Sequence, residues 1–194
     1  MNKVKVLLFD FTGVIAIDGF WDWMGKNISN IEEYRNYFKE KAIKWDKGDI
    51  SIREEVKKFA ARVNVPFIKV WQGIVGGFKA NEGMLEFISS LKPKYKIVIL
   101  SNFPRELFNE LIKKFSLTSY FDGFIISSDY HLIKPDPKFY MVALSKLQIK
   151  KDECFFIDDK MENVNAAQKL GIKSILYKDS DQCTFELKKL DISG

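Results

Sequence analysis

The stretch KVKVLLFDFTGVIAI at residues 3–17 decides the fold. Residues 4–9 form a nearly continuous apolar run, which is typical of a strand buried on both faces of a parallel sheet. Asp10 follows this run directly, and Gly13 lets the backbone turn sharply away from the strand. The stretch therefore predicts a central strand with a carboxylate at its carboxyl end, where open α/β sheets bind their ligands.

Polar residues follow or flank apolar, strand-like runs at three later places in the chain. They are Ser101 with Asn102, Lys134 in the sequence KPDP, and the acidic pair Asp158 and Asp159. A single Asp at a strand end often only caps the next helix, so Asp10 alone is weak evidence. Because the carboxyl ends of parallel strands meet at one edge, we expect Asp10, Ser101 and Asp158 to lie at the same edge of one sheet.

From residue 81 onward, helix-like and strand-like segments alternate. The expected strands are 95–100, 123–126, 154–157 and 172–176, and the expected helices are 84–91, 106–115, 137–147, 161–170 and 184–190. Such alternation favours right-handed crossovers and a parallel sheet that is covered by helices on both faces. The sequence therefore predicts an α/β fold with a Rossmann-like parallel sheet.

The segment between the first strand and this alternating part shows helical signatures and no convincing strand. Capping-box sequences at 29–32 and 51–54 predict two helix starts, and Pro66 precedes a third expected helix at 67–75. Gly73, Gly76 and Gly77 are expected to loosen the chain at a hinge. We expect an all-helical cap at 18–79, inserted into a Rossmann-like catalytic core made of 1–17 and 80–194.

Composition limits the classes of partner. The 194 residues carry 31 Lys and Arg against 26 Asp and Glu, but no concentrated basic block, so no nucleic-acid partner is expected. No apolar run approaches the ~18 residues of a membrane span and no signal pattern is visible, so we expect a cytoplasmic protein without a membrane partner. Cys154 and Cys183 are isolated thiols. The sequence does not indicate the oligomeric state.

In order and spacing, the polar residues resemble the four motifs of the haloacid dehalogenase-like (HAD) hydrolase superfamily. The motif residues are Asp10, Ser101 with Asn102, Lys134, and Asp158 with Asp159. A helical cap between the first two motifs is a feature of one group within that superfamily. The sequences KWDKGDIS at 44–51 and FFIDD at 155–159 are most similar to bacterial sugar-phosphate phosphatases related to the N-terminal domain of soluble epoxide hydrolase.

The resemblance implies a phosphatase that forms an aspartyl-phosphate on Asp10 and uses Mg²⁺. The ligands of the metal ion would be Asp10, the backbone carbonyl of Thr12, Asp159, and Asp158 directly or through water. Asn163 replaces an acidic residue found in many relatives and is expected to orient a metal-bound water. The implied substrate is a small phosphorylated metabolite such as a sugar phosphate.

The resemblance also implies how the phosphoryl group is bound. Ser101 and Asn102 would donate hydrogen bonds to its oxygens, and Lys134 would offset the charge of the nucleophile and of the phosphate. The single histidine, His131, lies three residues before Lys134. It has no partner pattern typical of a general acid, so we assign it no catalytic role.

Aromatic residues are abundant in the expected cap. They include Phe20, Trp21, Trp23, Tyr34, Tyr37, Phe38, Trp45 and Trp71. Aromatic residues at helical spacing more often form the core of a helical lid than the wall of a substrate pocket. We therefore expect these side chains to pack inside the cap.

The catalytic position two residues after Asp10 departs from the family pattern. Most phosphatases of the family have an Asp there that protonates the leaving group, and this chain has Thr12. A hydroxyl cannot supply that proton at neutral pH, and such acid–base help is typically worth ~10²–10⁴ in rate. Besides a phosphatase of modest turnover, two readings stay open: a 2-haloacid dehalogenase-type hydrolase, and a weakly active or non-catalytic member that binds a phosphorylated ligand.

Overall fold

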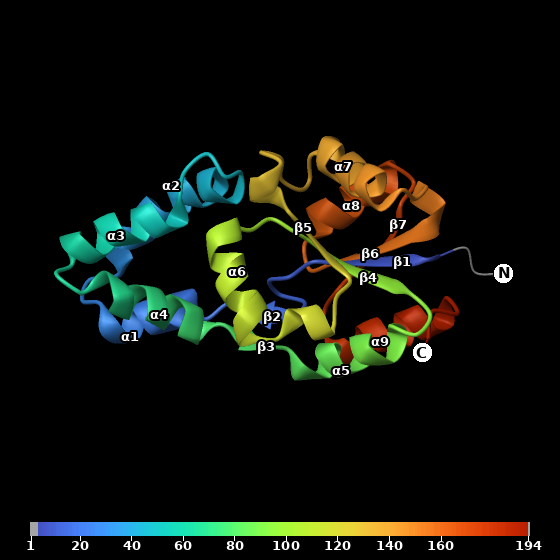
Figure 1. Cartoon of the computed structure of the whole chain (residues 1–194), viewed down its shortest axis with the longest axis horizontal. Coiled ribbons are helices and arrows are strands. Elements are labelled where there is room, and N and C mark those ends of the chain that lie inside the picture. Colours follow the sequence, from blue (N-terminus) through green and yellow to red (C-terminus); the bar gives the residue numbers. More distant parts are fainter. Residues whose placement is uncertain (1–3, 194) are drawn as a thin grey trace.

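The structure is a computed structural model that describes residues 4–193. A five-stranded parallel sheet lies in one half of the molecule, with helices on both of its faces (Figure 1). The strand order is β5-β4-β1-β6-β7. The strands are β1 (Val6–Phe9), β4 (Lys96–Ser101), β5 (Gly123–Ile126), β6 (Cys154–Asp158) and β7 (Lys173–Leu176). The predicted α/β fold class and the central position of the first strand are confirmed.

Alternate residues of β1 serve the two faces of the sheet. Val6 and Leu8 pack in one apolar cluster with side chains of α7 (Pro137–Leu147) and α8 (Met161–Lys169). Leu7 and Phe9 belong to a second cluster, on the opposite face. This cluster includes side chains of α5 (Glu82–Leu91), α6 (Arg105–Lys114) and α9 (Ser180–Lys189). All four β1 residues are therefore buried, which explains why the run lacks polar alternation.

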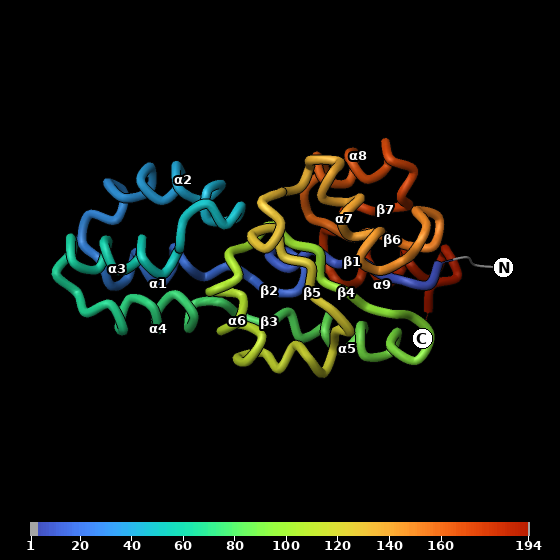
Figure 2. Tube along the Cα trace, turned by 45° about the horizontal axis from the view of Figure 1, so that its top comes forward, coloured from blue at the N-terminus to red at the C-terminus, as the bar shows by residue number. Residues whose placement is uncertain are grey.

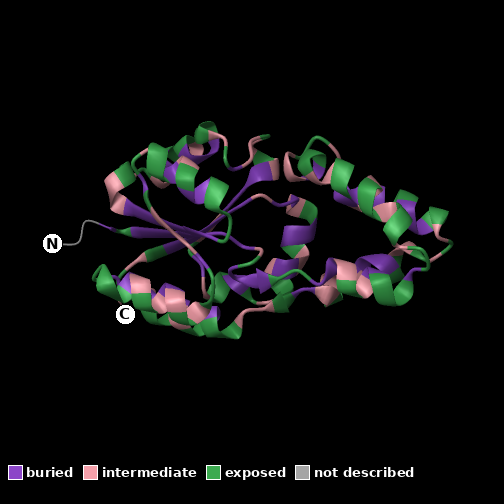
Figure 3. Ribbon diagram, turned by 180° about the vertical axis from the view of Figure 1, so that it is seen from behind, coloured by how far each residue is buried: buried purple, intermediate pink, exposed green. Residues whose placement is uncertain are grey.

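Four helices lie together at the end of the molecule opposite the two termini (Figure 2). They are α1 (Phe20–Asn27), α2 (Glu32–Asp46), α3 (Ile52–Arg62) and α4 (Phe67–Gly77). Their inward faces are buried like the sheet (Figure 3), and their apolar side chains continue the cluster that contains Leu7 and Phe9. Across residues 4–193, none of the helices combines the length and apolarity needed to cross a membrane.

One predicted helix start is wrong. α2 begins at Glu32 without a side-chain cap, because Asn30 adopts a left-handed conformation with φ of 55° and turns the chain after Ser29. The other predicted start is confirmed, since the Ser51 side chain accepts a hydrogen bond from the Glu54 amide at the beginning of α3. Only this second box presents its serine to free helix amides.

Two short strands missed in the sequence join the four helices to the sheet region. β2 (Ala16–Ile17) pairs antiparallel with β3 (Lys79–Ala80), and two-residue strands leave no readable periodicity. Beside them the backbones of Gly19 and Gly77 touch, such that a Cβ on Gly19 would lie 2.0 Å from the Gly77 carbonyl oxygen. Gly77 therefore permits close backbone contact with Gly19 at the end of α4.

Candidate active site

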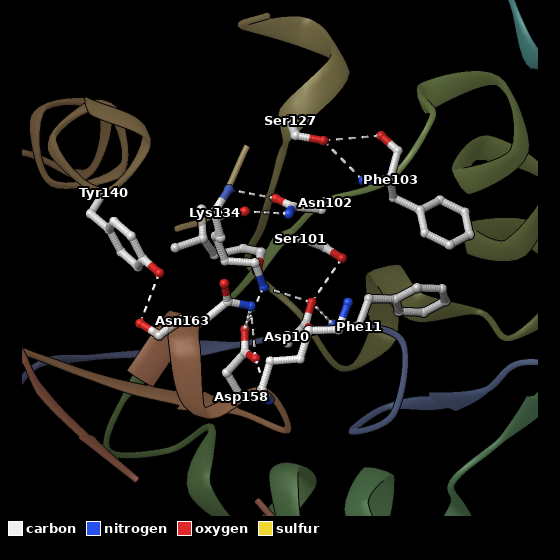
Figure 4. Close-up of polar contacts among 12 residues, drawn as sticks. Asp10, Phe11, Ser101, Asn102, Phe103, Ser127, Lys134, Tyr140, Asp158 and Asn163 are labelled. Atoms are coloured by element: carbon white, nitrogen blue, oxygen red, sulfur yellow. Dashed lines mark hydrogen bonds and ion pairs between the residues drawn. The ribbon is translucent and has the colours of Figure 1, made fainter. Parts of the chain in front are cut away.

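Asp10 occupies the carboxyl end of β1, buried between three hydrogen-bond donors (Figure 4). Its Oδ1 accepts from the Phe11 amide at 2.7 Å, from Ser101 Oγ at 2.9 Å and from Lys134 Nζ at 2.8 Å. All three donors converge on one oxygen. Among the residues that the structure describes, none donates to Oδ2, so this oxygen is left available to a ligand.

Lys134 joins the first and last predicted motifs. Its Nζ lies 2.8 Å from Asp10 Oδ1, 2.6 Å from Asp158 Oδ2 and 2.9 Å from the Leu100 carbonyl oxygen. These three contacts use all three N–H donors of the ammonium group. Burial disfavours the charged form, but the carboxylates of Asp10 and Asp158 outweigh it and raise the pKa of Lys134. The lysine therefore stays charged and offsets both carboxylates.

Asn102 fixes the backbone that carries this lysine. Its Nδ2 donates to the Lys134 carbonyl at 2.8 Å, and its Oδ1 accepts from the Lys134 amide at 2.7 Å. The structure thus places the side chain of Asn102 against the loop, and the Ser101 hydroxyl against Asp10. Both residues hold the groups around the expected phosphoryl site.

Asp158, at the end of β6, is held by an equally dense set of contacts. Its two oxygens both lie 3.0 Å from Asn163 Nδ2, and Oδ1 also accepts from the Lys160 amide at 2.8 Å. Burial, with a further contribution from Asp10 and against the effect of Lys134, raises the pKa of Asp158 to about 6. Tyr140 completes the set by donating to the Asn163 carbonyl at 2.9 Å. No signal in the sequence indicated Tyr140.

The acidic residues at this edge fit a hard divalent cation. Carboxylate oxygens of Asp10, Asp158 and Asp159 lie within 4.8 Å of one another. Thr12 Oγ1 and Asn163 Oδ1 are buried without a hydrogen-bond partner, so polar capacity at the site is left over. Oxygen donors of this kind are the ligands that Mg²⁺ prefers. The residues present are therefore compatible with the expected metal ion.

A cavity of about 340 Å³ opens over these groups. Its lining includes the predicted site residues Asp10, Thr12, Ser101, Asn102, Lys134, Asp159 and Asn163. The eighth predicted residue, Asp158, lies fully buried and is bonded to two of them. A Cβ on Gly13, another lining residue, would fall 2.3 Å from Asp159 Oδ2, so the glycine makes room for this carboxylate. The structure thus brings four remote segments to one place.

A second cavity, of about 450 Å³, lies between the four helices and the sheet region. Thr12, Asp18, Asn102 and Lys160 line both cavities, so the two adjoin. Aromatic side chains form much of its wall: Phe20, Trp21, Phe38, Trp45, Phe78 and Phe103. The expected packing inside the cap is confirmed for the first four of these, which contact one another, and the same four also line the cavity.

Polar contacts hold the four helices against the rest of the chain. Glu106 on α6 accepts from Ser51 Oγ at 2.8 and 2.9 Å and from the Arg53 amide at 3.2 Å. Ser127 Oγ donates to the Asp46 carbonyl at the end of α2. The exposed His131 faces Asp49 at 3.3 Å and does not line either cavity. These hydrogen bonds connect α2 and the start of α3 to α6 and to the residue that follows β5.

The profile of the haloacid dehalogenase-like hydrolases matches residues 26–177. The chain belongs to this family and is a HAD-like hydrolase, which confirms the resemblance found in the sequence.

Two relatives in sequence and one solved structure are similar to this chain. Flavin mononucleotide hydrolase 1 of Arabidopsis thaliana is 25% identical over 99% of this chain and 80% of that protein. The phosphorylated carbohydrates phosphatase of Thermotoga maritima is 25% identical over 65% of this chain and 57% of that protein. A HAD family enzyme of Bacteroides thetaiotaomicron, solved with magnesium and inorganic phosphate, has the same fold, with a TM-score of 0.76 and 23% identity over 91% of this chain and 95% of that one.

Proposed function

We propose that the protein is a Mg²⁺-dependent phosphatase of a small phosphorylated metabolite that works through an aspartyl-phosphate. The observation that carries the proposal is the state of Asp10, whose Oδ1 is fixed by three donors while Oδ2 is open beside two further carboxylates. A carboxylate held in this way is oriented for attack. Residues 1–17 and 80–194 act as the catalytic core, and 18–79 act as a cap over it.

Asp10, Asp159 and the backbone carbonyl of Thr12 would hold Mg²⁺, which supplies positive charge against the phosphoryl group. Asp158 is already bonded to Lys134 and to Asn163, so we assign it the role of binding the metal through water. The unpaired Oδ1 of Asn163 is available to a metal-bound water.

The remaining steps belong to residues of the chain itself. Asp10 Oδ2 attacks phosphorus, and Lys134 offsets the charge on the carboxylate. The Ser101 hydroxyl keeps Asp10 oriented in the free enzyme and would turn toward a phosphoryl oxygen when substrate binds. Asn102 keeps Lys134 in place through its two hydrogen bonds to that residue's backbone. Water then hydrolyses the aspartyl-phosphate.

The larger cavity supports a substrate whose alcohol part carries an apolar ring. Two relatives suggest different substrates, since one is named for flavin mononucleotide and the other for phosphorylated carbohydrates. The wall contributed by Trp21, Phe38 and Phe103 favours the former kind, because aromatic rings stack on planar, apolar surfaces. Arg35 and Lys39 also line this cavity and suit a second anionic group.

The test is hydrolysis of p-nitrophenyl phosphate, and of a panel of metabolite phosphates, with Mg²⁺ and with EDTA. We expect activity that needs the metal and that falls at least about 10⁴-fold in Asp10→Asn, because the nucleophile is lost. Activity in EDTA, or activity that survives Asp10→Asn, would contradict the mechanism. Metal-independent release of chloride from 2-chloropropionate would instead identify a dehalogenase. Ligand binding without either activity would identify a non-catalytic member.

A further inference from the structure

In the proposed reaction, position 12 holds a threonine where most phosphatases of the family have an acid. The Thr12 hydroxyl is buried without a hydrogen-bond partner, and a threonine hydroxyl does not donate its proton to a leaving alkoxide at neutral pH. Without a proton, the leaving oxygen of an alkyl phosphate must depart as a high-energy anion. A carboxyl group elsewhere on the cavity walls could supply it.

Four carboxylates line the two adjoining cavities: Asp10, Asp18, Asp46 and Asp159. Asp10 is the proposed nucleophile, and Asp159 belongs to the proposed metal site. Asp18 Oδ1 accepts from the Phe20 amide at 2.8 Å, at the start of α1. Asp46 differs from these three acids, because it has no role in the proposed mechanism so far. No residue in the described range 4–193 donates a hydrogen bond to its carboxylate or forms an ion pair with it.

The position of Asp46 is fixed by contact with the core. It is the last residue of α2, and its carbonyl oxygen accepts a hydrogen bond from the buried Ser127 hydroxyl. Two residues later the backbone of Gly48 lies so close to Ser128 that a Cβ would fall 2.4 Å from its carbonyl oxygen. Asp46 lines the larger cavity together with Thr12 and Asn102, and these two residues also line the cavity over Asp10.

We propose that Asp46, supplied by the cap, is the catalytic acid–base residue that takes over the role absent at Thr12. The proposal rests on the proposed function. In the first step Asp10 Oδ2 forms a bond to phosphorus, the bond from phosphorus to the leaving oxygen breaks, and the Asp46 carboxyl gives that oxygen its proton. In the second step the Asp46 carboxylate takes a proton from water as the water oxygen bonds to phosphorus. The bond to Asp10 breaks, inorganic phosphate leaves, and both side chains return to their first states.

The surroundings of Asp46 suit both steps. Burial raises the pKa of Asp46 to about 7; Asp10 adds to the rise, while Lys160 and Lys134 oppose it. Arg35 and Lys39 on the same helix, and Asp18 across the cavity, are the other charged groups that line the larger cavity with Asp46. An acid–base group is most effective when its pKa lies near the working pH, because both forms are then populated.

The decisive experiment compares two esters with the isosteric variant Asp46→Asn. Departure of 2-phenylethanol from its phosphate needs a proton, whereas p-nitrophenolate leaves as a stable anion. We expect kcat/KM for 2-phenylethyl phosphate to fall ~10²–10⁴-fold and kcat/KM for p-nitrophenyl phosphate to change less than about threefold. Because the second step also loses its base, p-nitrophenyl phosphate should give a burst of p-nitrophenolate followed by slow turnover. Equal effects on the two esters, or no effect on either, would overturn the proposal.

Matched variants keep the result specific. Asp49→Asn changes an acid on the same cap loop that lines neither cavity, and should leave the ratio of the two kcat/KM values unchanged. If Asp18→Asn, and not Asp46→Asn, selectively slows the alkyl ester, then Asp18 is the acid and the proposal is wrong. If the wild-type protein hydrolyses neither ester with Mg²⁺, the proposed function fails and the acid–base role falls with it.

The wild-type protein offers a second test that needs no variant. Above a pH of about 7 the Asp46 carboxyl loses its proton, so kcat/KM for 2-phenylethyl phosphate should fall about tenfold per pH unit relative to that for p-nitrophenyl phosphate. A ratio of the two that is constant from pH 6 to pH 9 would overturn the assignment.

Discussion

Two clusters of charged side chains, one at the sheet edge and one among the cap helices, use the same kinds of group in opposite proportions. At the sheet edge, one buried ammonium, that of Lys134, serves two buried carboxylates, those of Asp10 and Asp158. The negative charge is in excess, and burial raises the pKa of Asp158 to about 6. A cluster of this kind is incomplete without a further cation.

In the cap, one carboxylate serves two ammonium groups. Glu55 lies 2.5 Å from Lys41 and 2.8 Å from Lys58, and it also accepts from the Tyr37 hydroxyl at 2.8 Å. Burial works to raise the pKa of Glu55, but the hydrogen bonds from Lys41, Lys58 and Tyr37 outweigh it and lower the value to about 2. This carboxylate is fully satisfied by the chain itself.

The difference separates a cluster that binds from a cluster that stabilises. Carboxylate oxygens that lack a partner in a buried site can still bind a cation. A carboxylate whose oxygens are already paired with lysines cannot. The presence of lysine beside acidic residues therefore does not by itself predict whether a cluster binds a cation or only stabilises the fold. The ratio of the two, and their burial, decide the role.

The largest effect is expected from Lys134→Met, which removes the buried ammonium group that pairs with Asp10 and Asp158. Two buried carboxylates then face each other unpaired, and breaking a buried ion pair in this way typically costs 3–5 kcal/mol. We expect the free energy of unfolding in urea to fall by about that amount, and hydrolysis of p-nitrophenyl phosphate to be lost.

The matched control is Lys138→Met, four residues along in the same segment, where the lysine is exposed. Its effect on unfolding should stay within about 0.5 kcal/mol. Equal stability losses in the two variants would show that the Lys134 ammonium does not hold the cluster together.

The next effect concerns the cation that completes the cluster. Because Mg²⁺ would bind the folded protein alone, a concentration a hundred times its Kd should raise the free energy of unfolding by about 2.7 kcal/mol. Thermal unfolding monitored by circular dichroism, with and without Mg²⁺, measures the gain. Asp159→Asn should abolish most of it, whereas Asp181→Asn, at an exposed position on α9, should keep it. A gain that persists in Asp159→Asn would place the ion elsewhere.

The sheet-edge cluster could be predicted from the sequence, because the carboxyl ends of parallel strands lie at one edge of the sheet regardless of loop conformation. An apolar run followed by Asp10, and another followed by Asp158, was enough to place both carboxylates at one edge. The contact of Tyr140 with Asn163 was not readable, since it depends on how two helices pack on the sheet.

The cap was readable only in outline. Its helices could be expected from their periodicity, but the place of Asp46 in the wall of the larger cavity depends on the length of α2 and on its contact with Ser127. Which aromatic rings face the cavity is likewise set by the angle between the cap and the sheet region. Helical spacing identifies an apolar face and does not say whether a neighbour covers it entirely.

A smaller effect is expected in the cap cluster, from Glu55→Gln. A carboxylate with a lowered pKa contributes stability above its unfolded value of 4.5, and that contribution is lost as the pH falls from 4.5 toward 2. Because Lys58 is largely exposed, solvent screens the pair, and we expect a loss of about 1–2 kcal/mol at pH 7.

Urea unfolding of wild type and Glu55→Gln between pH 2 and pH 7 measures this difference. It should shrink to near zero at the acid end of that range. Glu54→Gln, next to it on α3, breaks an exposed pair with Lys57 and should cost less than about 0.5 kcal/mol at every pH. A stability difference between wild type and Glu55→Gln that does not depend on pH would mean that Lys41 and Lys58 do not lower the pKa of Glu55.

The smallest effect is expected at the junction of the two regions, in Glu106→Gln. The carboxylate of Glu106 receives the Ser51 hydroxyl and the Arg53 amide at the start of α3, and an amide oxygen can replace only part of this charge-assisted bonding. We expect the global stability to fall by about 0.5–1 kcal/mol.

Amide exchange in α3 should speed up while exchange in β1 does not, because the Glu106 contact joins α3 to α6 and does not involve the strands of the sheet. Glu110→Gln, whose carboxylate lies 3.8 Å from Arg53, should leave α3 exchange nearly unchanged. Equal acceleration in α3 and β1 would mean that the two regions open as one unit, and that the charge clusters they carry are not independent.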